Sequence, residues 1–198
     1  MATDDVLTLR EVSADEWDAA MILAARAFSG EPFGETVFGS DPLPRFANAQ
    51  RFYRAATPSE HDTHLGAYID DTLIGLCISS PSGHCHVCTH IDPTAPPADA
   101  VALIDWQFEV NVQRAHADQG AHGWISRVVV DSAVQGAGVG RTLVRRALDD
   151  LRADGAQAAL LECQPHREAM YAAWGFHRIR PFTDPAGPDA LLMRQDLS

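Results

Sequence analysis

The sequence predicts an α+β fold built on a central sheet flanked by helices, and three observations predict it. A buried strand, a glycine-rich turn, a helix and a second buried strand follow one another between Trp124 and Cys163. A β-hairpin is expected upstream over His64–Ser80, and a pair of strands is expected over Phe176–Asp196. Strand pairs on both sides of the central unit distinguish this pattern from a purely doubly wound parallel sheet.

Length and composition limit the classes of protein to which the chain can belong. Its 198 residues suit one domain over 1–198, and a hydrophobic fraction of 46% is enough for a core. The formal net charge of −12 argues against a nucleic-acid partner, which needs a basic face. No apolar run approaches the ~20 residues of a membrane span, and Met1–Arg10 has no signal-peptide pattern. Four cysteines in a chain of this length do not indicate a disulfide framework, so we expect a cytoplasmic location.

The first elements alternate between strand and helix. Val6–Arg10 is expected to be a strand, and Ser13 then begins a helix, with Glu16 completing a capping box. Apolar residues recur at helical spacing as far as Phe28. In the hairpin that follows, Asp70-Asp71 is an acceptable but weak two-residue turn.

Residues 29–60 are expected to elaborate the substrate side of the domain. Glu31–Leu43 is rich in glycine, proline and aromatic residues without a regular period, which predicts a loop or a loop with a short helix. Leu43–Ala56 is more helical. These residues form either a wall over a substrate pocket or ordinary packing under a loop.

The stretch His84–His90 contains Cys85 and Cys88, which are spaced like half of a zinc site. No second Cys-x-x-Cys or His-x-x-x-His follows it. In an extended chain its possible ligands would alternate between the two faces. We therefore expect a polar strand or loop near the pocket and no metal ion, and leave open whether this stretch binds one.

An additional helix is expected near residues 98–118, after the proline-rich linker Asp92–Pro97. Asp105 and Glu109 lie off the apolar stripe of this helix. Either carboxylate could face a pocket, although charged residues on a helix are more often solvated.

The run Gly136-Ala137-Gly138-Val139-Gly140 follows the strand Trp124–Asp131 and opens an amphipathic helix over Val139–Ala153. The unpaired N–H groups of a helix N-terminus bind anions, and glycines let a phosphate approach the backbone. A Walker loop is excluded because the chain has no lysine. The dinucleotide fingerprint fits poorly because Arg141 occupies the position of its third glycine.

The elements after this helix continue the alternation. Gly155 is its expected C-terminal cap, and the strand Ala158–Cys163 follows. Pro165 begins and Gly175 ends a further short helix. The last expected elements are the strand Phe176–Arg180, the Pro/Gly loop Asp184–Asp189 and the strand Leu191–Asp196.

This part of the chain contains two motifs, first Gln135-x-x-Gly138-x-Gly140 and then Met170-Tyr171-x-x-x-Gly175-Phe176. They resemble the Gln/Arg-x-x-Gly-x-Gly/Ala signature and the Leu/Phe-Tyr-x-x-x-Gly-Phe element of the GCN5-related N-acetyltransferase (GNAT) superfamily. The resemblance is sharp over Trp124–Arg180. It implies an α/β three-layer arrangement of a mixed, mostly antiparallel sheet, with a V-shaped opening between the strands Trp124–Asp131 and Ala158–Cys163.

The same resemblance implies how acetyl-CoA would bind as cosubstrate. Backbone groups of Val128, Val129 and Val130 would pair with the pantetheine arm, like an added strand. The other residues expected at coenzyme A are Gln135, Gly136, Ala137, Gly138, Val139, Gly140, Arg141, Thr142 and Gln164, the glycine-run amides holding the pyrophosphate. Gln164 stands where many members carry Asn, so its reach differs. Tyr171 would be the general acid for the leaving thiolate.

The implied reaction moves an acetyl group from acetyl-CoA to a primary amine of a small molecule by direct attack. The N–H of Val130 is a candidate oxyanion donor by position. Glu109, Glu162 and His166, or water held by one of them, are the candidate bases. The alternative is a non-catalytic module that binds or senses coenzyme A or acyl-CoA, against which the intact Tyr171 argues.

These expectations also define the partners. A small-molecule amine is expected, with no nucleic acid, no membrane and no metal, and a homodimer is left open. The sequence specifies neither the acceptor nor the length of the acyl group.

Overall fold

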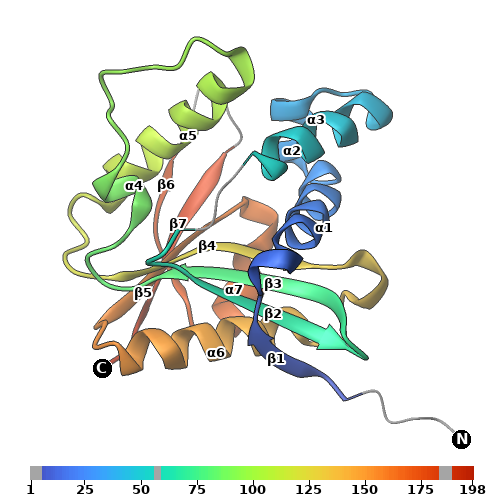
Figure 1. Ribbon diagram of the computed structural model, residues 1–198. Coiled ribbons are helices and arrows are strands. Elements are labelled where there is room, and N and C mark those ends of the chain that lie inside the picture. Colours follow the sequence, from blue (N-terminus) through green and yellow to red (C-terminus); the bar gives the residue numbers. More distant parts are fainter. Residues whose placement is uncertain (1–5, 56–58, 183–188) are drawn as a thin grey trace, which may run out of the picture.

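The computed structural model of the chain describes residues 6–55, 59–182 and 189–198, and its centre is one mixed sheet of seven strands (Figure 1). The strand order is β1-β2-β3-β4-β5-β7-β6. Neighbouring strands are antiparallel except β4 and β5, which are parallel. The strands are β1 (Thr8–Glu11), β2 (Thr63–Ile69), β3 (Thr72–Ser80), β4 (Gly123–Val130), β5 (Ala158–Cys163), β6 (His177–Phe182) and β7 (Ala190–Asp196).

Helices cover both faces of this sheet, which gives the expected three layers. One face carries α6 (Val139–Ala153) and α7 (Glu168–Ala173). The other face carries α1 (Trp17–Ser29), α2 (Pro32–Phe38), α3 (Pro42–Arg54), α4 (His86–Thr89) and α5 (Ala100–His116). Single 3-10 turns lie at η1 (Ala14–Glu16), η2 (Ser132–Val134) and η3 (Pro165–Arg167).

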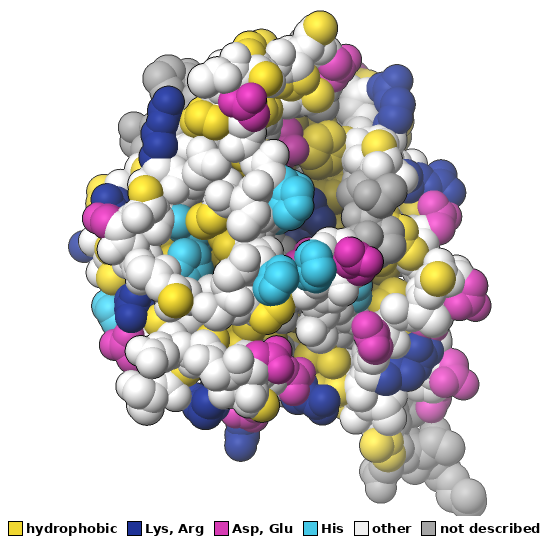
Figure 2. All heavy atoms as spheres, turned by 60° about the vertical axis from the view of Figure 1, so that its left-hand side comes forward, with side chains coloured by type: hydrophobic (Ala, Val, Ile, Leu, Met, Phe, Trp, Pro, Cys, Tyr) yellow, Lys and Arg dark blue, Asp and Glu magenta, His cyan; other side chains and the backbone are white. Residues whose placement is uncertain are grey.

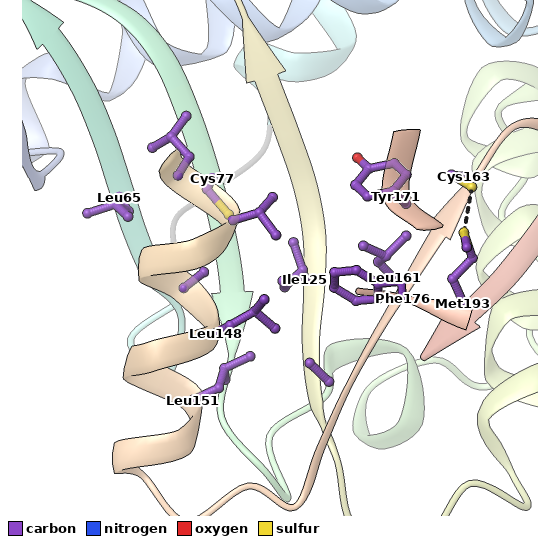
Figure 3. Packing of buried hydrophobic residues seen from close by; sticks show 14 of the residues in the cluster. Leu65, Cys77, Ile125, Leu148, Leu151, Leu161, Cys163, Tyr171, Phe176 and Met193 are labelled. Atoms are coloured by element: carbon purple, nitrogen blue, oxygen red, sulfur yellow. Dashed lines mark hydrogen bonds between the residues drawn. The ribbon is translucent and has the colours of Figure 1, made fainter. Parts of the chain in front are cut away.

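Helix α6 forms the core of its face, because its apolar residues recur on one side at helical spacing. Leu143, Val144, Ala147, Leu148 and Leu151 are all buried there. Figure 3 shows part of this cluster, which includes residues of strands on both sides of the β4–β5 junction. Each buried leucine contributes about 1.5–3 kcal/mol relative to an exposed one. Helix α6 packs mainly on β2, β3 and β4, and the same cluster continues through α7 and β5 on the other side of the junction.

The sheet opens in the expected V at the β4–β5 junction. The two strands are paired at only two positions, Gly123 with Ala159 and Trp124 with Leu160, and then diverge. On its other side β4 stays paired with β3 as far as Val130. No described residue pairs with the β5-facing side of β4 beyond Trp124. We call this side of Ile125–Val130 the open edge of β4.

Most of the predicted elements are present. Helix α6 and strand β5 have the predicted bounds, and α5 lies where the additional helix was expected. The hairpin forms, with φ of 47° at Asp70 and 63° at Asp71, the left-handed pair that a type I′ turn requires. The expected loop Asp184–Asp189 lies outside the described residues except for its last one. Among the described helices, none has the length and apolar character needed to cross a membrane.

One local prediction was wrong. The stretch His84–His90 was expected to be extended or a loop, but His86–Thr89 forms the helical turn α4. The carbonyl of Cys85 accepts hydrogen bonds from the N–H of Cys88 at 3.0 Å and the hydroxyl of Thr89 at 3.0 Å. These local bonds close the turn and place residues three apart on one side, rather than on alternating faces.

Candidate active site

The open edge of β4 offers backbone groups to a ligand. The N–H of Asp131 donates to the Ile74 carbonyl of β3 at 2.8 Å. Because consecutive strand residues direct their N–H groups to opposite sides, the N–H groups of Val128 and Val130 face the opening. The backbone of Val129, which was also expected at the pantetheine arm, faces β3 instead. Gln135 Nε2 donates to the carbonyl of Val130 at 3.2 Å and so ties the glycine-rich loop to the end of this edge.

Two glycines of the glycine-rich loop are needed for its backbone conformation. Gly136 and Gly138 have φ of 85° and 86°, and Gly138 is the left-handed N-cap of α6. A Cβ on Gly140 would lie 3.4 Å from both Trp174 and Val130. The loop thus brings the start of α6 close to the end of β4.

Not all of the backbone amides that were expected to hold the pyrophosphate, from Gly136 to Thr142, are available to a ligand. The N–H of Thr142 donates to Gly138 O at 3.0 Å, and the N–H of Ala137 donates to Val134 O at 3.3 Å. The first turn of a helix cannot pair its own N–H groups. The amides of Val139, Gly140 and Arg141 are therefore the ones best placed to hold an anion.

The open edge, the loop and α7 form one side of a cleft of about 1530 Å³. Tyr171, Cys163 and Gln164 line the same cleft. Figure 2 shows a face of the molecule that is hollowed, with hydrophobic side chains inside the hollow and histidines beside it. This volume exceeds the ~300–1,000 Å³ of a usual small-molecule pocket, so two substrates can lie in it together.

Tyr171 lies between the core and the cleft. Its ring makes edge contacts with Trp174 and Phe176, with centroids 5.2 and 6.0 Å away. Figure 3 shows its hydroxyl pointing away from Phe176. Burial, followed by the nearby Cys163 and Cys77 thiols, raises the pKa of Tyr171, so the phenol stays protonated. The packing fixes the ring and leaves a neutral proton donor at the cleft.

Two carboxylates of α5, Asp105 and Glu109, line the cleft one helical turn apart. Burial raises the pKa of Asp105 to about 6, and Arg127 of β4 opposes this rise. Burial and then repulsion from Asp105 raise the pKa of Glu109 to about 7, again against Arg127. Because the two groups interact, they titrate as a pair near neutral pH.

The other two candidate bases have partners in the structure. Glu162 Oε1 lies 2.6 Å from His116 Nε2, and its Oε2 accepts from Trp124 Nε1 at 2.9 Å. His166 Nε2 lies 3.1 Å from Glu31 Oε2, and its side chain is 47% exposed. All three candidates line the cleft. Burial raises the pKa of Glu109, whereas the carboxylate of Glu162 and the ring of His166 are engaged by the partners just described.

The far side of the cleft is aromatic. The lining rings come from helices α1, α2, α3 and α5 and are Phe28, Phe33, Phe52, Tyr53 and Phe108. Phe33 and Phe108 meet edge to face at 5.9 Å, which joins α2 to α5. Described residues of the region 29–60 therefore line the cleft; that they face a substrate there stays a prediction.

Some residues near the cleft were missed by sequence reasoning. Glu31 pairs with both His166 and Arg167 across the opening, which no local pattern predicts. His116 and His122 meet Cys85 and Cys88 in one cluster. The spacing His-x5-His, read together with the upstream Cys-x2-Cys, was the signal that could have found this cluster.

Comparison with known proteins is consistent with this geometry. Residues 31–176 match the model of the acetyltransferase (GNAT) family. Over 76 residues the chain is 40% identical to an IAA acetyltransferase of Azospirillum brasilense, covering 37% of this chain and 49% of that protein. Over 161 residues it is 27% identical to the N-alpha-acetyltransferase RimI of Mycobacterium tuberculosis, covering 80% and 78%. The chain spans about half the length of the first curated relatives it matches.

A solved structure supports the fold independently of sequence. A putative arylalkylamine N-acetyltransferase 7 of the yellow fever mosquito superposes with a TM-score of 0.70 at 13% identity. The superposition covers 97% of this chain and 88% of the mosquito protein. At this identity the likeness concerns the arrangement of helices and strands alone.

Proposed function

Since this chain belongs to the acetyltransferase (GNAT) family, we propose that it moves an acetyl group from acetyl-CoA to a primary amine of a small molecule by direct attack. The pantetheine arm of the donor pairs with the open edge of β4 at Val128 and Val130, as an added strand would. The pyrophosphate lies against the first-turn amides of α6, with Arg141 beside it. The positive φ of Gly138 at the N-terminus of α6 supports this placement.

In the proposed reaction the amine nitrogen attacks the thioester carbonyl, so that a C–N bond forms and the C–S bond breaks. The N–H of Val130 donates to the developing oxyanion, because it faces the opening and its own carbonyl is held by Gln135. The amine proton passes to Glu109, directly or through water. The proton of Tyr171 passes to the leaving sulfur.

The residues on the acceptor side of the cleft are the reason for proposing a small-molecule amine. Asp105 and Glu109 attract an ammonium group, and the aromatic wall around Phe33 and Phe108 accepts an apolar body. This pairing of half-buried carboxylates with an aromatic wall is the observation that carries the proposal.

An amine panel tests the acceptor. Purified protein is given acetyl-CoA and separate amines of four kinds: aromatic, aliphatic, amino sugar and peptide N-terminal. Release of free thiol is then measured. Aromatic and aliphatic small amines are expected to give the highest kcat/KM. Faster turnover of peptides would assign a protein acceptor instead, and coenzyme A binding without any thiol release would favour the sensing module.

Replacing Glu109 by Gln is expected to lower kcat by roughly 10²-fold, because an amide cannot take the amine proton. In the parent protein, kcat/KM should rise as pH passes through about 7, where Glu109 loses its proton. This acidic limb should disappear in the Gln variant. The measurement is a pH profile of kcat/KM with the best amine.

Two further variants separate Glu109 from its neighbours. Asp105→Asn removes the like charge that raises the pKa of Glu109, so the acidic limb should move to lower pH. His166→Asn should leave the limb in place. Loss of the limb in the His166 variant, with Glu109→Gln retaining it, would transfer the role of base to His166.

A further inference from the structure

Two cysteines and two histidines from separate elements meet at the foot of α5. Cys85 is the N-cap of α4 and Cys88 belongs to that turn, His116 ends α5, and His122 directly precedes β4. Each offers one ligand atom, and these four atoms all lie within 4.8 Å of one another. We infer that Cys85, Cys88, His116 and His122 bind one zinc ion in a tetrahedral site that anchors α4 and α5 to the sheet.

Three distances among the four ligand atoms, all measured from His116 Nδ1, match those of a tetrahedral zinc site. His116 Nδ1 lies 3.5 Å from Cys85 Sγ, 3.8 Å from Cys88 Sγ and 3.2 Å from His122 Nε2. Tetrahedral zinc, with bonds of about 2.3 Å to sulfur and about 2.0–2.1 Å to nitrogen, separates sulfur from nitrogen by about 3.6 Å. It separates two nitrogens by about 3.3 Å. The cluster therefore has the size of a zinc coordination sphere.

The second ring nitrogens of both histidines are held as metal ligands require. His116 Nε2 lies 2.6 Å from the Glu162 carboxylate, and His122 Nδ1 lies 2.7 Å from the Gly120 carbonyl. Trp124 Nε1 in turn donates to the other oxygen of Glu162. Ligating histidines typically donate to a carboxylate or a carbonyl in this way, which fixes the tautomer. This gives Glu162 a role as a positioning residue.

The hydrogen bonds of His116 and His122 fix the tautomers of the two rings, and these tautomers require a cation between them. A carbonyl can only accept, so Nδ1 of His122 carries the hydrogen and Nε2 carries a lone pair. The same reasoning at the Glu162 carboxylate leaves a lone pair on Nδ1 of His116. These two nitrogens face each other across 3.2 Å. Either a metal ion or an added proton must lie there, and the two adjacent sulfurs favour the metal.

Charge and access favour zinc. Binding of Zn²⁺ releases the protons of two thiols, and two thiolates with two neutral imidazoles give a centre of zero net charge, which suits a largely buried place. Cys85, His116 and His122 are buried, whereas Cys88 is exposed and leaves a path of entry. A sulfur and nitrogen set in tetrahedral geometry selects zinc over hard cations. Four protein ligands leave no open position, so the site is structural.

Zinc content is the direct test. The full chain is purified without chelator, dialysed and analysed for metals, and close to one zinc per chain is expected. Replacement by Co²⁺ should give the visible bands of a tetrahedral site and a thiolate-to-cobalt charge-transfer band. Removing zinc with a strong chelator should lower Tm by about 10 °C, the shift for a ligand near a thousand times its Kd. Added Zn²⁺ should restore Tm, and Mg²⁺ should not.

Matched variants locate the ion. Cys88→Ala is chosen because this exposed side chain contributes little packing, and it should lose zinc and the charge-transfer band while circular dichroism stays unchanged. His84→Ala removes an exposed histidine from the same stretch and should keep both. The inference is overturned if the unmodified chain holds no zinc and gives no cobalt band. A disulfide between Cys85 and Cys88, or a thiolate–imidazolium pair in metal-free protein with unchanged Tm, would also overturn it. None of these readouts depends on acetyl transfer.

Discussion

Replacement of Gly138 by Glu is expected to abolish binding of coenzyme A. The residue is the N-cap of α6 with φ of 86°, where any side chain costs roughly 1–3 kcal/mol of strain. The new carboxylate also places negative charge at the helix N-terminus, where the pyrophosphate is proposed to lie. Isothermal titration calorimetry with coenzyme A measures the effect, and the loss should exceed 10²-fold in Kd, or ~3 kcal/mol.

The other end of the same helix supplies a matched control. Gly155 has φ of 84° and, like Gly138, no atom within 4 Å of an added Cβ. Gly155→Glu should therefore cost similar stability, seen as a similar fall in Tm, while coenzyme A binding is retained. Tight binding by the Gly138 variant would mean that the pyrophosphate lies elsewhere.

Tyr171→Phe is expected to lower kcat by roughly 10²-fold or more while changing the Kd of coenzyme A only a few-fold. Phenylalanine keeps the ring contacts with Trp174 and Phe176 and removes only the proton donor. Burial raises the pKa of the Tyr171 phenol. Burial also raises the pKa of a thiol, and the pKa values of Cys77 and Cys163 are each raised to about 12. Proton transfer to a leaving thiolate in the same surroundings is therefore feasible.

Steady-state kinetics and calorimetry on the same preparation separate the two effects. Tyr68→Phe is the matched control, because its hydroxyl contacts Glu16 at 3.2 Å, away from the cleft. That variant should keep kcat. Unchanged turnover in Tyr171→Phe would remove the residue as general acid, and an equal loss of coenzyme A affinity would assign it to binding.

The elements that the sequence predicted best are those whose signals are local. The apolar spacing from Val139 to Leu151 and the cap at Gly155 define α6 without help from the rest of the chain. The same holds for the glycine loop, since Gly138 permits the left-handed conformation that it adopts at the start of α6. These features specify the half of the site that is expected to bind the donor.

The other residues of the site depend on which helices and strands pack against one another in the folded chain. Glu109 is half-buried because α5 lies against α2 and faces Arg127 of β4, and a single helix cannot reveal this. His116 and His122 join Cys85 only after 30 and 36 intervening residues fold back, so the motif looked incomplete. Side chains that become functional through tertiary contact are hidden from periodicity, whereas backbone geometry is not.

Because β4 and β5 are paired at so few positions, the sheet consists of two half-sheets joined at the start of β4. Only Gly123 and Trp124 bridge to β5, and a Cβ on Gly123 would lie 2.7 Å from Leu151 of α6. The absent side chain lets α6 pack closely against Gly123, and the helix otherwise lies mainly against β2, β3 and β4. Leucines of α6 therefore pack against the point from which β4 and β5 diverge. We expect that substitutions at Gly123 or Leu151 can alter the opening between the two strands without contacting a substrate.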